Sequence, residues 1–395
     1  MSPRNRVKGK ASILLVVAGL SLMAYALWEI AQTPDRLQYI VQADPVTDVS
    51  DPDAAADSDA EAYSPLRRRI AALEDSAAVL EQAAAVYTLS GAAPQVTLSA
   101  DDAGAAAGLK AVGSDHFVLY PALLLQGRFP NPEESDLGER VILLDELLAL
   151  DLFRMTEVVD REVKLEGAAY RVIGVLRHQK RVGDDADRYA YIPLLAAAKA
   201  GIRLETLCLS AAPVAKGGAM LTFAETARQW MPGGNAYDLR RERVGAGIWA
   251  RFFACGVGYA LLAWSISKYI RSVGALRKSI DEKLADRYVA RLLPYLLFHI
   301  LLRVVALAAL AVAAAALTNL LLEPVKVYPE FVPDILVEPA EIAKTFWALR
   351  DAESDAVVIR TPQIVRLLYF GRLCNIAVIL TLWGGCLAFS KRRRR

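Results

Sequence analysis

The spacing of four long apolar runs constrains this chain more than any other feature of its sequence. The runs lie at 11–30, 246–266, 292–322 and 364–389, and about two hundred mostly polar residues separate the first from the second. A helix needs roughly 20 apolar residues to cross about 30 Å of hydrocarbon. We therefore expect a membrane protein with four transmembrane α-helices and a large domain inserted between helices 1 and 2.

The charges between the runs predict the side of the membrane on which each segment lies. Residues 1–10, 267–291 and 391–395 together hold 16 basic and 3 acidic side chains. Residues 31–245 hold 22 basic and 32 acidic side chains, and residues 323–362 hold 4 and 8. Because short cytoplasmic segments are enriched in Lys and Arg, we expect both termini to be cytoplasmic and the large domain to be extracytoplasmic. The domain's acidic balance gives no support to nucleic-acid binding.

These patterns divide the chain into consecutive segments. We expect a cytoplasmic N-terminus with helix 1 at 1–31, an extracytoplasmic domain at 32–245, helix 2 at 246–266, a cytoplasmic segment at 267–291, helix 3 at 292–322, an extracytoplasmic loop at 323–362, and helix 4 with a basic cytoplasmic tail at 363–395. Within the large domain, residues 42–60 are acidic and rich in Ala, Asp and Pro, which is typical of a flexible linker.

The first apolar run has two interpretations. Ala24, Tyr25 and Ala26 form an A-x-A triplet after an apolar core, as in a cleaved signal peptide. The run nevertheless continues to Ile30, and Trp28 stands where an interfacial aromatic would stand, which favours an uncleaved anchor. Cleavage would leave three transmembrane helices, with the C-terminus still in the cytoplasm.

The sequence of the large domain predicts an α+β fold. Leu66, Ile70, Leu73, Ala77, Leu80, Ala84 and Tyr87 recur at heptad spacing. They predict a helix from Pro65 to Gly91, either lying on the domain's own sheet or forming a stalk or intersubunit seam. After it come short apolar runs that we interpret as strands, with a helix at 145–153: QVTLSA, HFVLY, ERVILLD, REVKLEG, YRVIGVL and RYAYIPL. Residues 161–176 predict a hairpin whose second arm, RVIGVL, is a central strand. Only Cys208 of four cysteines lies in this domain, so no disulfide can close within it.

Residues 96–195 resemble the outer core domain of the MacB/FtsX family of ABC transporter permeases. The resemblance rests on a GR-aromatic turn, an acidic loop, a strand, a helix ending in Leu-Phe, a hairpin and a Tyr-Ile-Pro strand. The matching residues are Gly127, Arg128, Phe129, Leu152, Phe153, Gly167, Tyr170, Val172, Ile173, Gly174, Val175, Tyr191, Ile192 and Pro193. The four-helix topology with a large insertion after helix 1 agrees with it independently.

The resemblance also implies how such a chain is driven. Family members carry, after the second span, a basic segment that contacts an ATPase, and YIRSVGALRKSI at 269–280 is a partial match to it. The implied contact residues are Tyr269, Arg271, Val273, Gly274, Leu276 and Arg277. Ile270, Val273, Leu276 and Ile280 recur at helical spacing opposite basic residues, so 267–291 could equally be a basic helix that rests on anionic headgroups.

The sequence contains no G-x-x-x-x-G-K-[ST] loop for nucleotide phosphates, and its three histidines are far apart. We therefore expect no enzyme activity, metal or cofactor in this chain, with ATP and Mg bound by a separate cytoplasmic P-loop ATPase. Polar residues within the apolar runs are either a seam between helices or part of a substrate route, or side chains that simply snorkel or pack; these are His299, Arg303, Arg372 and Asn375.

Small residues in the last two runs are typical of close helix contact. Eight alanines between Ala306 and Ala316 make one face of helix 3 small, and Gly384 and Gly385 do the same for helix 4. We expect a second permease copy or a paralogue as partner.

Two functions remain open at this point. The first is a permease-like subunit that couples the ATPase to extracytoplasmic work, namely export, extraction or hydrolase regulation. The second is a degenerate membrane scaffold, uncoupled from any ATPase, whose outer domain binds an extracytoplasmic partner.

Overall fold

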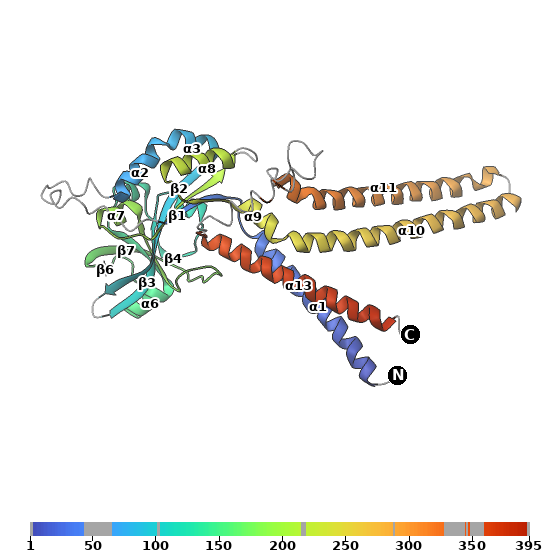
Figure 1. The fold of residues 1–395 in the computed structure, drawn as a ribbon, viewed down its shortest axis with the longest axis horizontal. Coiled ribbons are helices and arrows are strands. Elements are labelled where there is room, and N and C mark those ends of the chain that lie inside the picture. The colour runs from blue at the N-terminus through green and yellow to red at the C-terminus, as the bar shows by residue number, and fades with distance from the viewer. Residues whose placement is uncertain are drawn as a thin grey trace. The chain divides into compact units, whose positions relative to one another are not determined.

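The computed structural model describes residues 3–42, 65–100, 103–214, 219–286, 289–327, 344, 347 and 359–392. The chain forms two compact units (Figure 1). The helical unit comprises Met1–Ala31, Arg243–Asp355 and Phe370–Arg395, and the sheet unit comprises Gln32–Glu242 and Ala356–Tyr369.

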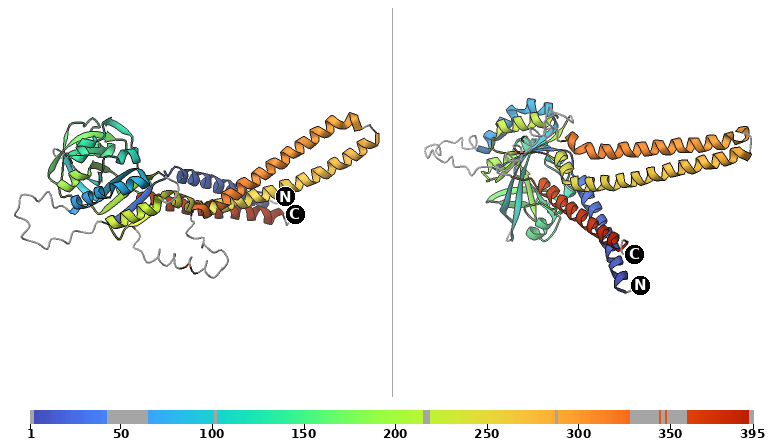
Figure 2. Two further views of the ribbon diagram at one scale, coloured as in Figure 1. Left: turned by 90° about the horizontal axis from the view of Figure 1, so that it is seen from above. Right: turned by 45° about the vertical axis from the view of Figure 1, so that its right-hand side comes forward.

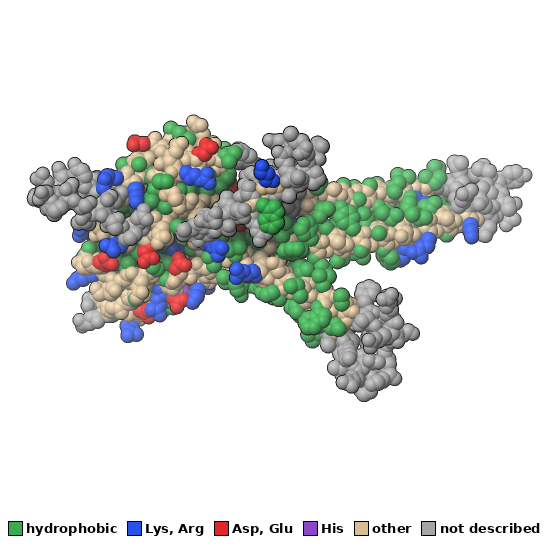
Figure 3. All heavy atoms as spheres, viewed as in Figure 1, with side chains coloured by type: hydrophobic (Ala, Val, Ile, Leu, Met, Phe, Trp, Pro, Cys, Tyr) green, Lys and Arg blue, Asp and Glu red, His purple; other side chains and the backbone are tan. Residues whose placement is uncertain are grey.

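The helical unit contains the long helices of the chain. They are α1 (Pro3–Ala31), α10 (Ile248–Asp286), α11 (Val289–Val327) and most of α13 (Pro362–Arg392). Among the described residues, each contains a stretch long and apolar enough to cross a membrane: Ser12–Ala31, Ile248–Leu276, Leu297–Glu323 and Pro362–Ala388. Hydrophobic side chains cover much of these helices in Figure 3, with some Lys and Arg toward the far end of the α10–α11 pair, whereas Asp and Glu gather over the sheet unit. The expected four helices are confirmed.

Small residues and hydrogen bonds join these helices in pairs. In the pair α1–α13, Ser12 Oγ donates to the carbonyl oxygen of Gly384 at 2.7 Å, and a Cβ on Gly384 would lie 2.8 Å from Val16. In the pair α10–α11, Arg251 Nη1 lies 2.8 Å from Glu323 Oε2. Gly384 thus packs within the chain, whereas a Cβ on Gly385 would meet nothing. Pairing with a second copy stays a prediction.

The sheet unit is built on one ten-stranded sheet (Figure 2). The strands are β1 (Leu37–Gln42), β2 (Ala84–Ala100), β3 (Ala103–Val112), β4 (Leu124–Gly127), β5 (Val141–Asp145), β6 (Glu162–Leu165), β7 (Ala168–Leu176), β8 (Tyr189–Pro193), β9 (Thr206–Pro213) and β10 (Asn235–Asp238). Their order is β10-β1-β9-β2-β3-β8-β5-β7-β4, with β6 paired to β2 and β7. The β3–β8 and β5–β7 pairs are parallel, and the other pairs are antiparallel.

Eight shorter helices occur among the residues that the structure describes. They are α2 (Pro65–Asp75), α3 (Ala77–Ala83), α4 (His116–Leu119), α5 (Pro132–Asp136), α6 (Glu146–Phe153), α7 (Leu194–Lys199), α8 (Ala219–Trp230) and α9 (Leu239–Ala246). Three of them, α2, α3 and α8, pack together, and α3 and α8 lie against β1, β2 and β9.

Alternation along the strands gives this sheet two different faces, because successive side chains point to opposite sides. On β1, Leu37, Tyr39 and Val41 enter the main core beside α8, and the hydroxyl of Tyr39 donates to the carbonyl oxygen of Met231. Gln38 and Ile40 point to the other face and line a cavity. The same division places Leu207 and Leu209 of β9 in the core, and Cys208 and Ser210 of that strand in the cavity.

Several sequence-based expectations about local structure are confirmed. The hairpin is formed by β6 and β7, and Glu166 and Gly167 turn it with positive φ values of 49° and 88°. The arm RVIGVL lies between β5 on one side and β4 and β6 on the other, as a central strand should. The α+β class of this unit is likewise confirmed, and α6 corresponds to the helix expected at 145–153.

Two expectations were wrong. The helix expected from Pro65 to Gly91 breaks at Ser76 and ends at Ala83, after which β2 begins. The β-favouring run from Val86 to Thr88 pairs with β9, and this pairing outweighs the heptad spacing. The run HFVLY at 116–120 forms α4 rather than a strand, because a short apolar run does not by itself distinguish the two structures.

The first segment ends as expected, because α1 ends at Ala31. Three other expected segments, 267–291, 42–60 and 323–362, are described only in part. The segment 267–291 is no separate amphipathic helix, since α10 continues without a break to Asp286. Gln42 ends β1, and 43–60 of the expected linker lies outside the described residues, as does most of the expected loop 323–362.

Candidate functional site

The family-like turn at Gly127, Arg128 and Phe129 closes one end of the β4–β7 pair. Gly127 has φ +77°, and a Cβ there would lie 2.1 Å from the carbonyl oxygen of Ile173. The backbone N–H of Arg128 donates to that same oxygen at 3.0 Å. On β7, a Cβ on Gly174 would lie 2.9 Å from the carbonyl oxygen of Arg128. Both glycines are thus required because two backbone segments approach each other closely.

An ion pair that the sequence did not reveal fixes this turn to α5. Arg128 Nη1 donates to Glu134 Oε2 at 2.6 Å, and Glu134 Oε2 accepts a second bond from the backbone N–H of Asn131 at 2.9 Å. The hydrogen bonds from Arg128 lower the pKa of Glu134 to about 2. Glu134 occupies the N3 position of a capping box whose N-cap is Asn131, and the pattern N-P-x-E was the signal available in the sequence.

The other family-like residues of this unit are distributed along β7 and β8. Phe129 stacks on Phe117 with ring centroids 4.5 Å apart, and Tyr191 approaches Phe117 at 5.8 Å. The structure therefore brings the turn and Tyr191 together. Gly167 lies at the opposite end of β7, where a Cβ would meet nothing. Tyr170 is buried in the main core, and Pro193 ends β8 at the start of α7.

The residues expected to contact an ATPase lie on two sides of α10. Tyr269 and Leu276, seven residues apart, are half-buried, and the hydroxyl of Tyr269 donates to the carbonyl oxygen of Arg303 on α11. Arg271 and Val273 are exposed, and a Cβ on Gly274 would meet nothing. The side chain of the sixth residue, Arg277, lies outside the described part.

Arg303 belongs to the polar residues within the apolar runs, and it contacts the part of α10 that holds the residues expected to contact an ATPase. Its Nη2 donates to the carbonyl oxygen of Ser272 on α10 at 2.8 Å. His299 lies one turn earlier on α11. Arg372 is exposed on α13 and Asn375 is half-buried there. In the described part of the chain, neither hydrogen bonds to His299 or Arg303. The roles expected for these four polar residues stay predictions.

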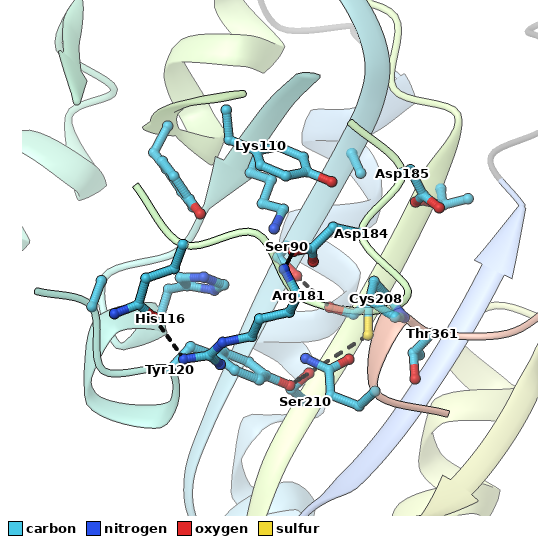
Figure 4. A pocket seen from close by; sticks show the side chains of 18 of the residues that line it. Ser90, Lys110, His116, Tyr120, Arg181, Asp184, Asp185, Cys208, Ser210 and Thr361 are labelled. Atoms are coloured by element: carbon cyan, nitrogen blue, oxygen red, sulfur yellow. Dashed lines mark hydrogen bonds between the residues drawn. The ribbon is translucent and has the colours of Figure 1, made fainter. Parts of the chain in front are cut away.

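A cavity of about 530 Å³ in the sheet unit escaped the sequence analysis (Figure 4). Its floor is the face of β1, β2 and β9 opposite the main core. Around the floor stand α4, the segment that follows β7 and the first turn of α13. These elements are far apart in the sequence, so no local motif could have indicated the cavity.

A row of hydrogen bonds crosses the cavity floor. The hydroxyl of Tyr120 accepts from Gln38 Nε2 at 2.7 Å and donates to Ser210 Oγ at 2.8 Å. Gln38 Oε1 accepts from the hydroxyl of Thr361 at 2.7 Å, which connects the floor to the residue preceding α13. Cys208 Sγ lies 3.5 Å from Ser210 Oγ, and burial raises the pKa of this thiol to about 11. At neutral pH Cys208 is a protonated, weakly nucleophilic group.

Lys110 is one of the cations that line this cavity. Its Nζ lies 3.9 Å from the ring centroid of Tyr189 and 5.6 Å from that of Tyr191. Burial lowers the pKa of Lys110, and that of His116 on α4 falls to about 3, through burial first and then the charges of Lys110 and Arg36. No group of three metal-ligating side chains occurs among the described residues.

Comparison with known proteins relates the chain to one family. The family described as MacB-like periplasmic core domain matches residues 11–229. Similar solved structures include the extracellular domain of the noncanonic ABC-type transporter YknZ from Gram-positive bacteria, at 15% identity and a TM-score of 0.36, covering 49% of this chain and 92% of that one. The periplasmic region of MacB from Actinobacillus actinomycetemcomitans has 15% identity and a TM-score of 0.39, covering 54% and 94%. A domain of a putative permease from Porphyromonas gingivalis has 10% identity and a TM-score of 0.31, covering 40% and 74%. No curated protein matches the chain.

Proposed function

Because this chain belongs to the family with a MacB-like periplasmic core domain, the permease components of ABC transporters, we propose that it is the transmembrane subunit of a mechanotransmitting transporter. A separate cytoplasmic P-loop ATPase, which binds ATP and Mg, drives it. On nucleotide binding the ATPase moves the end of α10 in each of two permease copies. The sheet unit then does its work outside the membrane on a peptide, a lipid-linked protein or a cell-wall enzyme.

The unbroken course of α10 is the observation that carries this proposal. The helix runs from Ile248 to Asp286, through a candidate span and on through the basic residues that follow it. A push at the basic end therefore travels along a rigid rod that has no break between Ile248 and Asp286. Arg303 ties α11 to the same part of α10, so the two helices move as one pair.

The exposed side of α10 is available to such an ATPase. Arg271 and Val273 are exposed there, and Gly274 leaves room for a close approach. A Lys and Arg-rich helix end also suits anionic headgroups. A point substitution tests the contact better than a deletion, because removal of 267–291 would destroy α10 and the start of α11 together.

The test is co-purification of the full chain from its native membrane, with and without crosslinking, followed by mass spectrometry. We expect a stoichiometric P-loop ATPase with the unchanged chain. Arg271→Glu should reduce recovery of the ATPase about tenfold, because reversing this charge turns an attraction at the edge of the contact into a repulsion. The matched control is Arg203→Glu, which reverses an exposed charge of the sheet unit and should leave recovery unchanged.

Two outcomes would count against coupling. Full ATPase recovery with Arg271→Glu would contradict the proposed contact. Recovery of extracytoplasmic proteins alone, even after crosslinking, would support the scaffold function instead. The observation that favours the scaffold is the segment YIRSVGALRKSI, which matches the coupling segment of the family only in part.

A further inference from the structure

We propose that the cavity of the sheet unit binds a small organic anion with an apolar body, and that Lys110 holds its anionic group. The proposal does not depend on coupling to an ATPase. It rests on the placement of one cation, on the charges around it and on the apolar surface beside it.

Within the described part of the chain, Lys110 forms no ion pair with a carboxylate. Figure 4 shows its side chain pointing into the cavity, where its Nζ lies against the rings of Tyr189 and Tyr191. The charges of Asp184 and Asp185 reach Lys110 from farther away and offset only part of the effect of burial on its pKa. Removing an ammonium group from water without a counter-charge in contact with it costs free energy. An anion placed beside Nζ would remove this cost, and a tyrosine ring replaces it only in part.

The charged side chains that line the cavity favour an anion as its ligand. Five basic and four acidic side chains line the cavity: Lys110, Arg177, Arg181, Arg360 and Arg366 against Asp145, Asp184, Asp185 and Glu205. Asp145 Oδ2 is 2.9 Å from His178 Nδ1, and Asp184 Oδ2 accepts from the backbone N–H of Arg181 at 2.7 Å, so both carboxylates already have partners. The other two acids, Asp185 and Glu205, are exposed.

The positive charges of Lys110 and Arg36 also act on His116 of α4. The charges of Lys110 and Arg36 both contribute to the low pKa of His116. Its imidazole is therefore neutral at physiological pH, so it neither attracts nor repels an anion by charge. Arg36 lies over the ring of Tyr120 at 4.5 Å from its centroid.

The remaining lining suits an apolar body of limited size. Pockets for small molecules typically have about 300–1,000 Å³, and the cavity falls within this range. Apolar side chains from β1, β2, α4, β7 and the loop before β4 line it beside the charged groups: Ile40, Ala92, Pro94, Phe117, Leu123 and Leu176. Pro362 and Gln363 also line it, so a bound ligand would contact the first turn of α13, the helix that continues into a candidate span.

The test measures binding of two probes with one apolar body and opposite charge. The full chain is reconstituted in lipid nanodiscs and dialysed to equilibrium against labelled 4-phenylbutyrate or 4-phenylbutylamine, with empty nanodiscs as the blank. We expect the carboxylate to bind above the blank and at least about tenfold more tightly than the amine, since a charge-assisted hydrogen bond contributes about this much.

Variants of Lys110 separate the anion site from mere apolar binding. Lys110→Met should weaken binding of the carboxylate about tenfold or more, whereas Lys110→Arg, which keeps the charge, should bind it within about threefold of the unchanged chain. Lys164→Met is the matched control, because Lys164 is exposed on β6 and away from the cavity. Lys110→Met should also melt no lower than the unchanged chain, since it removes an unpaired ammonium.

Three results would overturn the proposal. The first is binding of 4-phenylbutyrate no stronger than to empty nanodiscs. The second is equal or tighter binding of the amine, which would make the site one for cations. The third is unchanged affinity in Lys110→Met, or equal loss in the Met and Arg variants.

Discussion

Arg303 of α11 donates a 2.8 Å hydrogen bond to the carbonyl oxygen of Ser272, in the middle of α10. That oxygen lies beside Arg271 and Val273, the exposed residues expected to contact an ATPase. The bond therefore ties the exposed stretch of α10 to its neighbouring helix. A second hydrogen bond joins the two helices, because the hydroxyl of Tyr269 donates to the carbonyl oxygen of Arg303.

Substitution of Arg303 by Met should loosen this part of α10 while leaving both helices formed. The guanidinium bond is lost, and the Met side chain still fills the space along the helix pair. We expect amide hydrogen exchange of residues 269–276 in nanodiscs to become severalfold faster, which corresponds to about 1 kcal/mol. Arg372→Met is the control, since Arg372 is exposed on α13. Equal exchange in Arg303→Met and the unchanged chain would show that the bond does not restrain α10.

Sequence patterns predicted the membrane helices and the strands of this protein better than its short helices. Long apolar runs and the β-favouring runs from ERVILLD to RYAYIPL have one dominant signal, and the structure follows it. In contrast, Ala84 and Tyr87 satisfied a heptad pattern and yet lie in β2, where pairing with β9 determines their conformation. Tertiary pairing of this kind cannot be read from local spacing.

Two glycines of the outer-domain motif should respond very differently to Ala. At Gly127, with φ +77°, a Cβ would lie 2.1 Å from the carbonyl oxygen of Ile173, so the strand pair must move apart. Gly167 has φ +88° but open space around it, so only the backbone conformation is strained. We expect Gly167→Ala to cost about 1 kcal/mol and Gly127→Ala about 3 kcal/mol or more of unfolding free energy. Thermal unfolding measures both, and equal losses would contradict the close approach at Gly127.

The sequence indicated some residues of the candidate sites and not others. Gly127 and Arg128 stand in a recognisable turn, and the pattern N-P-x-E could have indicated Glu134 as a capping residue, although not as the partner of Arg128. Lys110 had no such signal. Its environment is made by Tyr189 and Tyr191, which the parallel pairing of β3 with β8 places beside it from eighty residues away.

Glu134→Gln should destabilise the protein in a pH-dependent way. The pKa of Glu134 is lowered to about 2 in the folded state by Arg128, so its contribution is full above the unfolded value near 4.5 and is lost as the pH falls through about 2. We expect a deficit of about 1 kcal/mol at pH 7, kept small because Arg128 is 44% exposed. Melting curves from pH 7 to pH 3 should show this deficit shrink. Glu133→Gln is the control, because the neighbouring side chain of Glu133 is exposed. This variant should show no deficit at either pH.

His116 should make the sheet unit sensitive to mild acid. Burial, with the charges of Lys110 and Arg36, lowers its pKa to about 3 in the folded state, against about 6.5 when unfolded. Between these values the unfolded chain binds the extra proton, so stability falls as the pH is lowered from about 6.5 towards 3, by up to about 1.4 kcal/mol per pH unit. His116→Phe keeps an aromatic ring beside Phe117 and Tyr120 but cannot bind a proton. The melting temperature of the variant should therefore fall less between pH 7 and pH 5 than that of the unchanged chain, and an identical fall in both would show that His116 is already solvated in the folded state.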